Sequence, residues 1–274
     1  MSSITDIYSP RTTFRCTRLR GAKVGSSVCQ FCAVGCSQLG FFKDGKLIDV
    51  EGDPRSAVNE GRLCPKGSST YALNENPYRK VKPMYRAPGS DHWEEVTLDW
   101  MLDTVAKRIW DTRNKGFVEK DPATGITVNN CANIGFIGGS ANDNEECYLF
   151  RKLFTGGLGI LPVENSARYC HSTTVAALSP TFGFGACTNP PRDLLNSDCI
   201  LIMGSNMAEA HPCAFYWPMQ AKKKGAVTIH VDPRYTRTSA ACDHHVHILP
   251  ETDIAFLSAV IRYILEKGWW FKEY

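Results

Sequence analysis

The chain has 274 residues, of which 43% are hydrophobic and 22% charged, and its formal net charge is +3. This is the composition of a folded protein, and so small a net charge gives no reason to expect nucleic acid or an anionic membrane surface as a partner. No run approaches the roughly 18 apolar residues that a membrane-spanning helix requires. We therefore expect one large domain or two modest ones with no direct membrane span.

Cysteine is the unusual residue, with twelve copies. So many thiols indicate either a disulfide framework or a reduced protein that uses them for metals or catalysis. The first 22 residues contain four arginines and no apolar stretch typical of a secretory signal. We therefore expect a cytoplasmic protein. The alternative is a periplasmic one, if a twin-arginine signal has been lost or lies on a partner.

Four of the cysteines are spaced as metal ligands. Cys29, Cys32 and Cys36 form C-x2-C-x3-C, and Cys64 follows in the segment LCPKG. The glycines and short apolar runs between them predict a small β-hairpin module with its turn at Asp44-Gly45, too small to be stable without a crosslink. Structural zinc sites usually pair two two-cysteine knuckles, so a three-plus-one set favours a 4Fe–4S cluster. Zinc, or four unrelated buried cysteines, are the alternatives.

The next segments predict helices and strands in alternation. Apolar residues at helical spacing predict a helix over 97–116, and a polar surface loop is expected over 115–130. A short buried strand is expected over 134–137. A helix capped by Asp143 should then run to the glycine pair at 156–157.

A strand–helix–strand unit follows. The apolar run 199–203 predicts a buried parallel strand, 213–224 a helix and 227–231 a second strand, and a last helix is expected over 253–267. Gly204, Asn206 and Asp232 should lie at the carboxyl ends of the strands, where open α/β sheets bind ligands. The unit lacks G-x-G-x-x-G, so an α/β core with ordinary turns remains the alternative.

Together these segments resemble the N-terminal part of the catalytic subunit of molybdenum- or tungsten-dependent formate dehydrogenases, among the molybdopterin-dinucleotide oxidoreductases. The matching stretches are VCQFCAVGC (28–36), LCPKG (63–67), ARYCH (167–171), IMGSN (202–206) and VDPR (231–234). The segment PETD (250–253) resembles the family's P-G-T-D, with Glu251 in place of glycine.

The resemblance implies an α/β fold: a small N-terminal iron–sulfur β-module, then an α/β domain with a Rossmann-like, mostly parallel sheet that binds a pterin guanine dinucleotide. The expected extents are 1–26 for an N-terminal extension, 27–90 for the 4Fe–4S module and 91–274 for the dinucleotide-binding domain. The implied activity is reversible oxidation of formate to CO2 at a Mo or W bis(molybdopterin guanine dinucleotide) centre, with electrons leaving through the 4Fe–4S cluster.

The resemblance also implies residue roles. Cys170 would ligate Mo or W, His171 would handle the proton, and Lys66 would lie on the electron route between the cofactors. The cluster ligands would be Cys29, Cys32, Cys36 and Cys64. One dinucleotide arm would be held by Gly204, Asn206, Glu209, Asp232, Arg234, Thr236 and Asp253.

The family's large subunits continue for several hundred residues, which carry most of the second pterin site and an arginine that orients formate. The resemblance therefore implies a polypeptide carrying the rest of the catalytic subunit, with Trp269, Trp270 and Phe271 at an interface. An iron–sulfur electron-transfer subunit is a second expected partner. The alternatives are another molybdopterin oxidoreductase, such as a periplasmic nitrate reductase, or a non-catalytic iron–sulfur subunit.

Two further groups are expected to be structural. His244, His245 and His247 read as part of a surface or interface strand rather than a metal cluster. The cysteines without ligand spacing are expected to be mostly buried and inert: Cys131, Cys147, Cys187, Cys199, Cys213 and Cys242.

Overall fold

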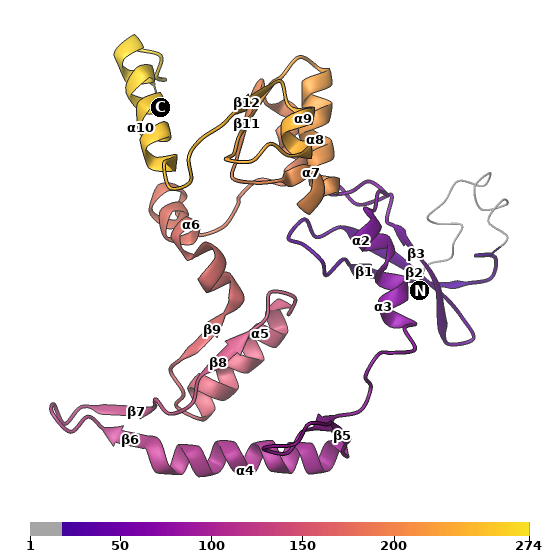
Figure 1. Ribbon diagram of the computed structural model, residues 1–274, viewed down its shortest axis with the longest axis vertical. Coiled ribbons are helices and arrows are strands. Elements are labelled where there is room, and N and C mark those ends of the chain that lie inside the picture. Colours follow the sequence, from indigo (N-terminus) through magenta and orange to yellow (C-terminus); the bar gives the residue numbers. More distant parts are fainter. Residues whose placement is uncertain (1–17, 274) are drawn as a thin grey trace. The chain divides into compact units, whose positions relative to one another are not determined.

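The computed structural model describes residues 18–273, and its internal contacts divide them into two units (Figure 1). The first unit contains residues 18–75 and 189–273, and the second contains residues 76–188. The expected extents of 27–90 and 91–274 stay a prediction. Within the described residues, no helix combines the length and apolar character needed to cross a bilayer.

The first unit begins with a three-stranded antiparallel sheet. Its strands pair in the order β1 (Lys23–Val28), β2 (Ser37–Lys43), β3 (Lys46–Gly52), and two short helices follow, α2 (Pro65–Ser68) and α3 (Thr70–Asn74). The predicted hairpin is β2–β3. Asp44 and Gly45 form its turn with φ of 50° and 77°, the left-handed conformation that two-residue hairpin turns require. Strand β1, which the pattern did not predict, covers the free edge of β2.

The segment between β3 and Cys64 is fixed by close packing and by one buried amide. A Cβ on Gly52 would overlap the carbonyl oxygen of Gly61. Asn59, 1% exposed, accepts from Ser37 N at 3.0 Å and donates to Ser37 O at 3.1 Å and Arg62 O at 2.8 Å. These contacts hold the approach to Cys64 against the start of β2.

The second part of the first unit is a three-stranded parallel sheet. Its strands pair in the order β10 (Cys199–Met203), β11 (Val227–Val231), β12 (His244–Val246). The helices are η3 (Pro191–Asn196, a 3-10 helix), α7 (Met207–Ala210), α8 (Pro212–Lys223), α9 (Arg237–Ala241) and α10 (Asp253–Lys267). Ile200 and Ile202 of β10 pack with Phe215 and Ala221 of α8. The predicted strand–helix–strand unit and the last helix are therefore confirmed.

Helix α8 packs against the sulfur-rich module as well as against its own sheet. The Trp217 indole N–H donates to Val58 O at 3.1 Å, and Arg62 donates to the Tyr216 hydroxyl at 2.9 Å. The Arg62 guanidinium also lies 3.8 Å from the centre of the Tyr216 ring, a cation–π contact. Side chains on consecutive residues of α8 thus bind the segment that leads to Cys64.

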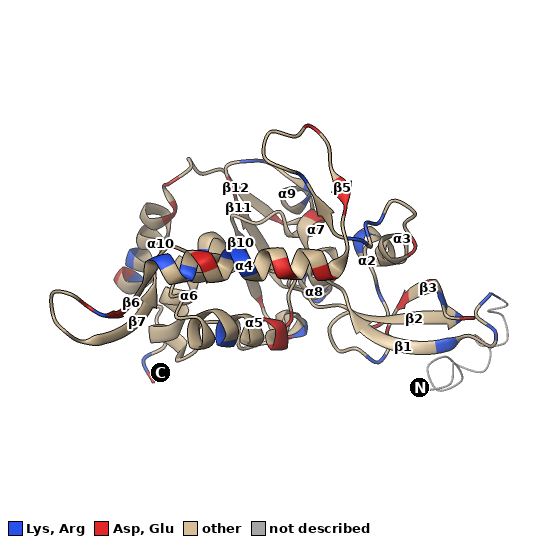
Figure 2. Cartoon of the chain, turned by 90° about the horizontal axis from the view of Figure 1, so that it is seen from below, with Lys and Arg blue, Asp and Glu red and all other residues tan. Residues whose placement is uncertain are grey.

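The second unit consists of small sheets and three longer helices. Its elements are β4 (Met84–Tyr85), β5 (Glu94–Glu95), α4 (Leu98–Gly116), β6 (Phe117–Lys120), β7 (Thr127–Cys131), β8 (Phe136–Gly138), α5 (Asn144–Arg151), η2 (Lys152–Gly157, a π-helix), β9 (Val163–Asn165) and α6 (Ser166–Phe182). Thr97 caps α4, and Asp143 forms a capping box with Glu146, as expected. Figure 2 shows opposite charges toward the two ends of α4, Asp99 in the first turn and Lys115 in the last, which complements the helix dipole.

Two expectations for the second unit are wrong, and one element was missed. The segment 115–130 is a hairpin, β6–β7, because Asp121 accepts from the backbone N–H groups of Ala123 and Thr124, both at 2.8 Å, and closes a tight turn. The strand expected at 134–137 is present as β8, which begins at Phe136, but it is not buried as expected, because Ile137 is 70% exposed. Helix α6 had no predicted counterpart.

We expect Gly52→Ala to destabilise the first unit by about 1–3 kcal/mol, the usual cost of forcing a methyl group into a packed site. The matched control is Gly25→Ala in β1, where the new Cβ would lie 3.6 Å from the Phe42 ring, an ordinary contact. Urea unfolding of both variants measures the difference. Equal midpoints would show that the Gly52–Gly61 approach imposes no constraint.

Candidate functional site

The four predicted ligand cysteines lie around one pocket, together with a fifth cysteine. We call this site the thiol pocket; it is lined by Cys29, Phe31, Cys32, Val34, Cys36, Leu63, Cys64, Gly67, Pro212 and Cys213. The hydrogen bond from Cys29 N to Cys36 O, 2.8 Å, closes the loop that carries three of the thiols. Gly35, with φ of 65°, turns the chain just before Cys36. The five cysteines of the thiol pocket form no disulfide.

Burial and neighbouring sulfur favour the protonated form of two of these thiols, Cys36 and Cys213. Burial, with a smaller contribution from Cys213, raises the pKa of Cys36 to about 12. Burial likewise raises the pKa of Cys213. Binding of a metal at this pocket must therefore displace a proton from Cys36.

The chemistry of the donors fits an iron–sulfur cluster. Apart from the thiols, the side chains lining the pocket are apolar, and an Fe–S cluster takes one thiolate per iron. Within residues 18–273 no three His, Cys, Asp or Glu side chains form a group that could hold a single metal ion.

Cys213 joins the thiol pocket although its spacing did not predict this. It is buried, as expected, and packs with Cys29 and Cys36 in one cluster. Its position 149 residues after Cys64 gave no spacing signal. Only the packing of α8 on the module brings it there. The exposed Cys187 and Cys199 depart from the expectation of burial.

Lys66 connects the thiol pocket to the next predicted site. It lies in α2, two residues after Cys64, and its ammonium donates to the carbonyl of Ala210 at 3.0 Å. Ala210 ends α7, whose first turn contains Glu209. The positive charge therefore lies between the thiols and the residues predicted to bind the dinucleotide.

A polar group gathers where β10 and β11 end. Gly204 follows β10 in the left-handed conformation, with φ of 62°, and Asp232 follows β11. The Asn206 amide is hydrogen bonded to Glu209 and accepts from the Thr238 hydroxyl at 3.0 Å. The predicted placement of Gly204, Asn206 and Asp232 at the carboxyl ends of parallel strands is thus confirmed.

A buried histidine stabilises this group through hydrogen bonds. The ring of His230 is fully buried, and burial lowers its pKa. Its Nε2 lies 3.2 Å from Ser205 O, which can only accept, so Nε2 donates and Nδ1 accepts from the Ser239 hydroxyl at 2.8 Å. Ser239 in turn accepts from Thr236 N at 2.8 Å. No sequence pattern selects His230, yet this residue links the turn after β10 to the start of α9.

The other residues predicted to bind the dinucleotide differ in how accessible their side chains are to a ligand. Thr236 is buried and caps α9, so its hydroxyl is already used within the protein. The Asp232 carboxylate accepts a hydrogen bond from the Arg234 backbone N–H at 2.7 Å. The Arg234 side chain is exposed. Asp253 is exposed in the first turn of α10. His244 and His245 lie in the expected strand, β12, and His247 follows it, with the rings of His245 and His247 6.5 Å apart.

Cys170 and His171 lie in the second unit, on α6. Both side chains are exposed, and His171 departs from helical geometry, with φ of −139° and ψ of 29°, so the helix kinks there. Arg168 is paired with Glu164 at 2.9 Å, one turn earlier. The Cys-His pair is therefore presented at a break in the helix rather than packed in a core.

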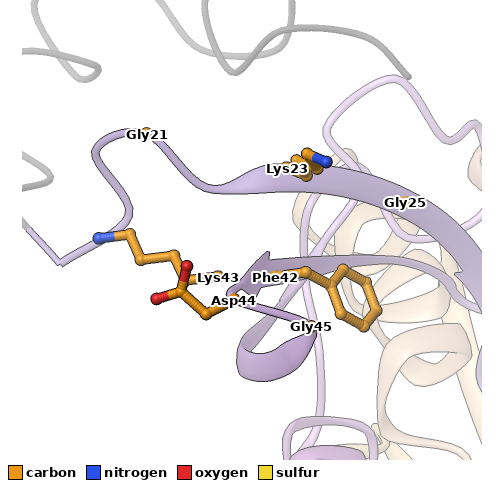
Figure 3. Close-up of a pocket in the computed structure, with 7 residues that line it drawn as sticks. All are labelled: Gly21, Lys23, Gly25, Phe42, Lys43, Asp44 and Gly45. Atoms are coloured by element: carbon orange, nitrogen blue, oxygen red, sulfur yellow. The ribbon is translucent and has the colours of Figure 1, made fainter.

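A larger hollow of about 570 Å3 lies elsewhere in the first unit. Figure 3 shows its lining on β1 and on the β2–β3 turn: Gly21, Lys23, Gly25, Phe42, Lys43, Asp44 and Gly45. It contains no cysteine, no histidine and none of the predicted site residues. We therefore assign this hollow no part in the candidate site, although it is larger than the thiol pocket.

Known families match both parts of the chain. The molybdopterin oxidoreductase Fe4S4 domain matches residues 22–76, and the molybdopterin oxidoreductase family matches residues 79–269. Acetylene hydratase from Pelobacter acetylenicus has a similar fold, with a TM-score of 0.67 at 19% identity over 90% of this chain and 32% of that one. These matches confirm the predicted order of an iron–sulfur module followed by an α/β domain.

Curated relatives add sequence similarity over nearly the whole chain. Formate dehydrogenase subunit alpha of Megalodesulfovibrio gigas is 52% identical over 92% of this chain and 25% of its own length. The F420-dependent formate dehydrogenase subunit alpha of Methanocaldococcus jannaschii is 32% identical over 92% of this chain and 34% of its own length. The chain thus spans only a quarter to a third of these relatives.

In the metal-free chain, we expect Cys36 to react with iodoacetamide at pH 8 at least tenfold more slowly than Cys32, which is half-buried in the same loop. Only the thiolate reacts, and a pKa raised from 9.0 to about 12 leaves almost none at that pH. Mass spectrometry of timed samples measures both rates, and denaturant should equalise them. Equal rates in the folded chain would contradict the burial of Cys36.

Proposed function

The chain belongs to the molybdopterin oxidoreductase family, and we propose that it is the N-terminal part of the catalytic subunit of a formate dehydrogenase. The observation that carries this proposal is the 52% identity to the M. gigas formate dehydrogenase alpha subunit over 92% of the chain. A second relative, formate dehydrogenase 2 subunit alpha (cytochrome c-553) of Nitratidesulfovibrio vulgaris, is 46% identical over 94% of it. The reaction converts formate reversibly to CO2, one proton and two electrons.

Four thiolates would hold the electron-transfer cluster. We assign Cys29, Cys32, Cys36 and Cys64 as ligands of one 4Fe–4S cluster, supported by their convergence on the thiol pocket and by the Fe4S4 family match. The apolar lining keeps water from the cluster and so affects its reduction potential.

The Cys-His pair on α6 would provide the reacting residues. A Mo or W ion held by two molybdopterin guanine dinucleotides supplies the two-electron chemistry when bound. Cys170 would bind that ion through its exposed sulfur, and His171 would accept the proton from formate. Imidazole is the side chain that most often accepts and releases protons in catalysis. The helix break at His171 supports this role because it frees both side chains from the packing of a regular helix.

One dinucleotide arm would bind where β10 and β11 end. Asp232 and Glu209 can accept from guanine N–H groups or ribose hydroxyls, and Arg234 can pair with phosphate. Asn206 and Gly204 form the turn beside them, and Asp253 is the remaining candidate. Thr236 would contribute indirectly, because its side chain caps α9. Lys66 would stabilise negative charge as electrons pass toward the cluster.

Two protein partners complete the proposal. The relatives extend far beyond the matched region, so a polypeptide carrying the rest of the catalytic subunit would complete the second pterin site. An iron–sulfur electron-transfer subunit would receive the electrons. The exposed apolar side chains of Trp269, Trp270 and Phe271, at 69%, 49% and 71% exposure, support contact with a partner.

We expect Cys64→Ala to abolish the paramagnetic signal of the reduced cluster, because the cluster would lose one of its four thiolates. Iron analysis and electron paramagnetic resonance of the purified protein measure this. Cys199→Ala, an exposed cysteine of β10, is the control and should keep the signal. Stoichiometric zinc without iron in the unaltered protein would refute the cluster assignment.

We expect Cys170→Ala in the assembled enzyme to eliminate formate oxidation with an artificial acceptor while the cluster signal persists. His171→Ala should reduce turnover by roughly 10²–10⁴-fold, the usual effect of losing an acid–base group. Cys187→Ala, another exposed cysteine of the second unit, is the control. Full activity of either site variant would overturn its assigned role, and an unaltered enzyme inactive on formate would overturn the proposed substrate.

A further inference from the structure

The thiol pocket contains one more sulfur than a 4Fe–4S cluster requires. Cys213 is the second residue of α8, is 7% exposed, and lines the pocket beside Cys29 and Cys36. The three-plus-one set already supplies one thiolate for each of four irons. Cys213 is therefore available for another role at the same site.

Two contacts define where the Cys213 sulfur points. It packs with Cys29 and Cys36 in one buried cluster, and it lies 3.8 Å from the carbonyl oxygen of Arg62, to which it donates. Helix α8 fixes this position, because Trp217 and Tyr216 bind the segment before Cys64. The thiol is held in place by the helix rather than by the loop that carries Cys29, Cys32 and Cys36.

Metal binding changes the best acceptor for the Cys213 hydrogen. In the metal-free pocket Cys213 directs this hydrogen toward Arg62 O. A thiolate bound to iron has no hydrogen, so any hydrogen bond between the two sulfurs must then come from Cys213. The negatively charged Cys36 sulfur is also a stronger acceptor than the distant carbonyl.

We propose that Cys213 is a positioning residue of the cluster, whose S–H donates a hydrogen bond to the iron-bound sulfur of Cys36 and raises the reduction potential of the cluster. This inference rests on the proposed cluster at Cys29, Cys32, Cys36 and Cys64. A donor beside a ligand sulfur stabilises the extra electron of the reduced state, and hydrogen bonds to sulfur are among the factors that set these potentials. Cys213 is thus assigned to tuning electron transfer and not to ligation.

The test compares three substitutions in the cluster-loaded protein. Cys213→Val and Cys213→Ala remove the donor, and Cys213→Ser keeps one. We expect Val and Ala to shift the ratio of reduced to oxidised cluster at least threefold toward oxidised at a fixed potential, about 30 mV for a one-electron couple. Ser should match the unaltered protein or shift the opposite way. A spectroscopic redox titration measures this without formate turnover.

A second measurement detects the hydrogen directly. After exchange into D2O, electron–nuclear double resonance of the reduced cluster should show a deuteron coupling in the unaltered protein that is missing in Cys213→Val. Cys242→Val, at a half-buried cysteine outside the thiol pocket, is the matched control and should change neither the potential nor the coupling.

Each outcome bears on one claim. An unaltered protein without iron refutes the proposed cluster. Four irons with unchanged potentials in Val and Ala overturn the hydrogen bond alone. Loss of iron in Ala with native circular dichroism would show that Cys213 is a ligand, and would also overturn the proposal.

Discussion

The hydrogen bond from the Trp217 indole to Val58 O is the contact on which the organisation of the first unit depends. It fixes a helix of the parallel sheet against a module whose own core is a small cluster of Leu19, Val24, Leu39 and Phe41. Because α8 lies across Val58 and Arg62, its first turn closes the thiol pocket. The same helix packs its apolar face on β10. Helix α8 therefore connects the thiol pocket to the parallel sheet.

This arrangement places a positive charge beside the apolar thiol pocket within the first unit. Apart from its thiols the pocket is apolar, and Lys66 binds the carbonyl of Ala210, next in the chain to Glu209, whose carboxylate pairs with Arg237. A reduced cluster gains negative charge, which an adjacent ammonium stabilises. The buried, neutral His230 adds no competing charge, because it holds the turn after β10 through hydrogen bonds alone.

The sequence predicted features that depend on local pattern. The hairpin turn at Asp44-Gly45, the caps at Thr97 and Asp143, and the apolar strands around α8 were predicted because each requires particular residues at adjacent positions. The hairpin β6–β7 was missed because its turn is polar and its strands carry little apolar alternation. Cys213 and His230 were missed for another reason: their partners lie in other elements, so no spacing identifies them. The roles of Cys170 and His171 came from resemblance, and α6 itself was not predicted.

The sequence separation within the thiol pocket has a consequence for biosynthesis. The Cys213 sulfur and the Arg62 carbonyl are 151 residues apart in the chain. At about 5–20 residues per second, a ribosome needs roughly 8–30 s to extend the nascent chain from one to the other. During that interval the four ligand cysteines are synthesised before the helix that covers them. Iron insertion before α8 folds would meet an open, solvent-exposed set of thiols, so maturation after synthesis of the whole unit is the order that this topology favours.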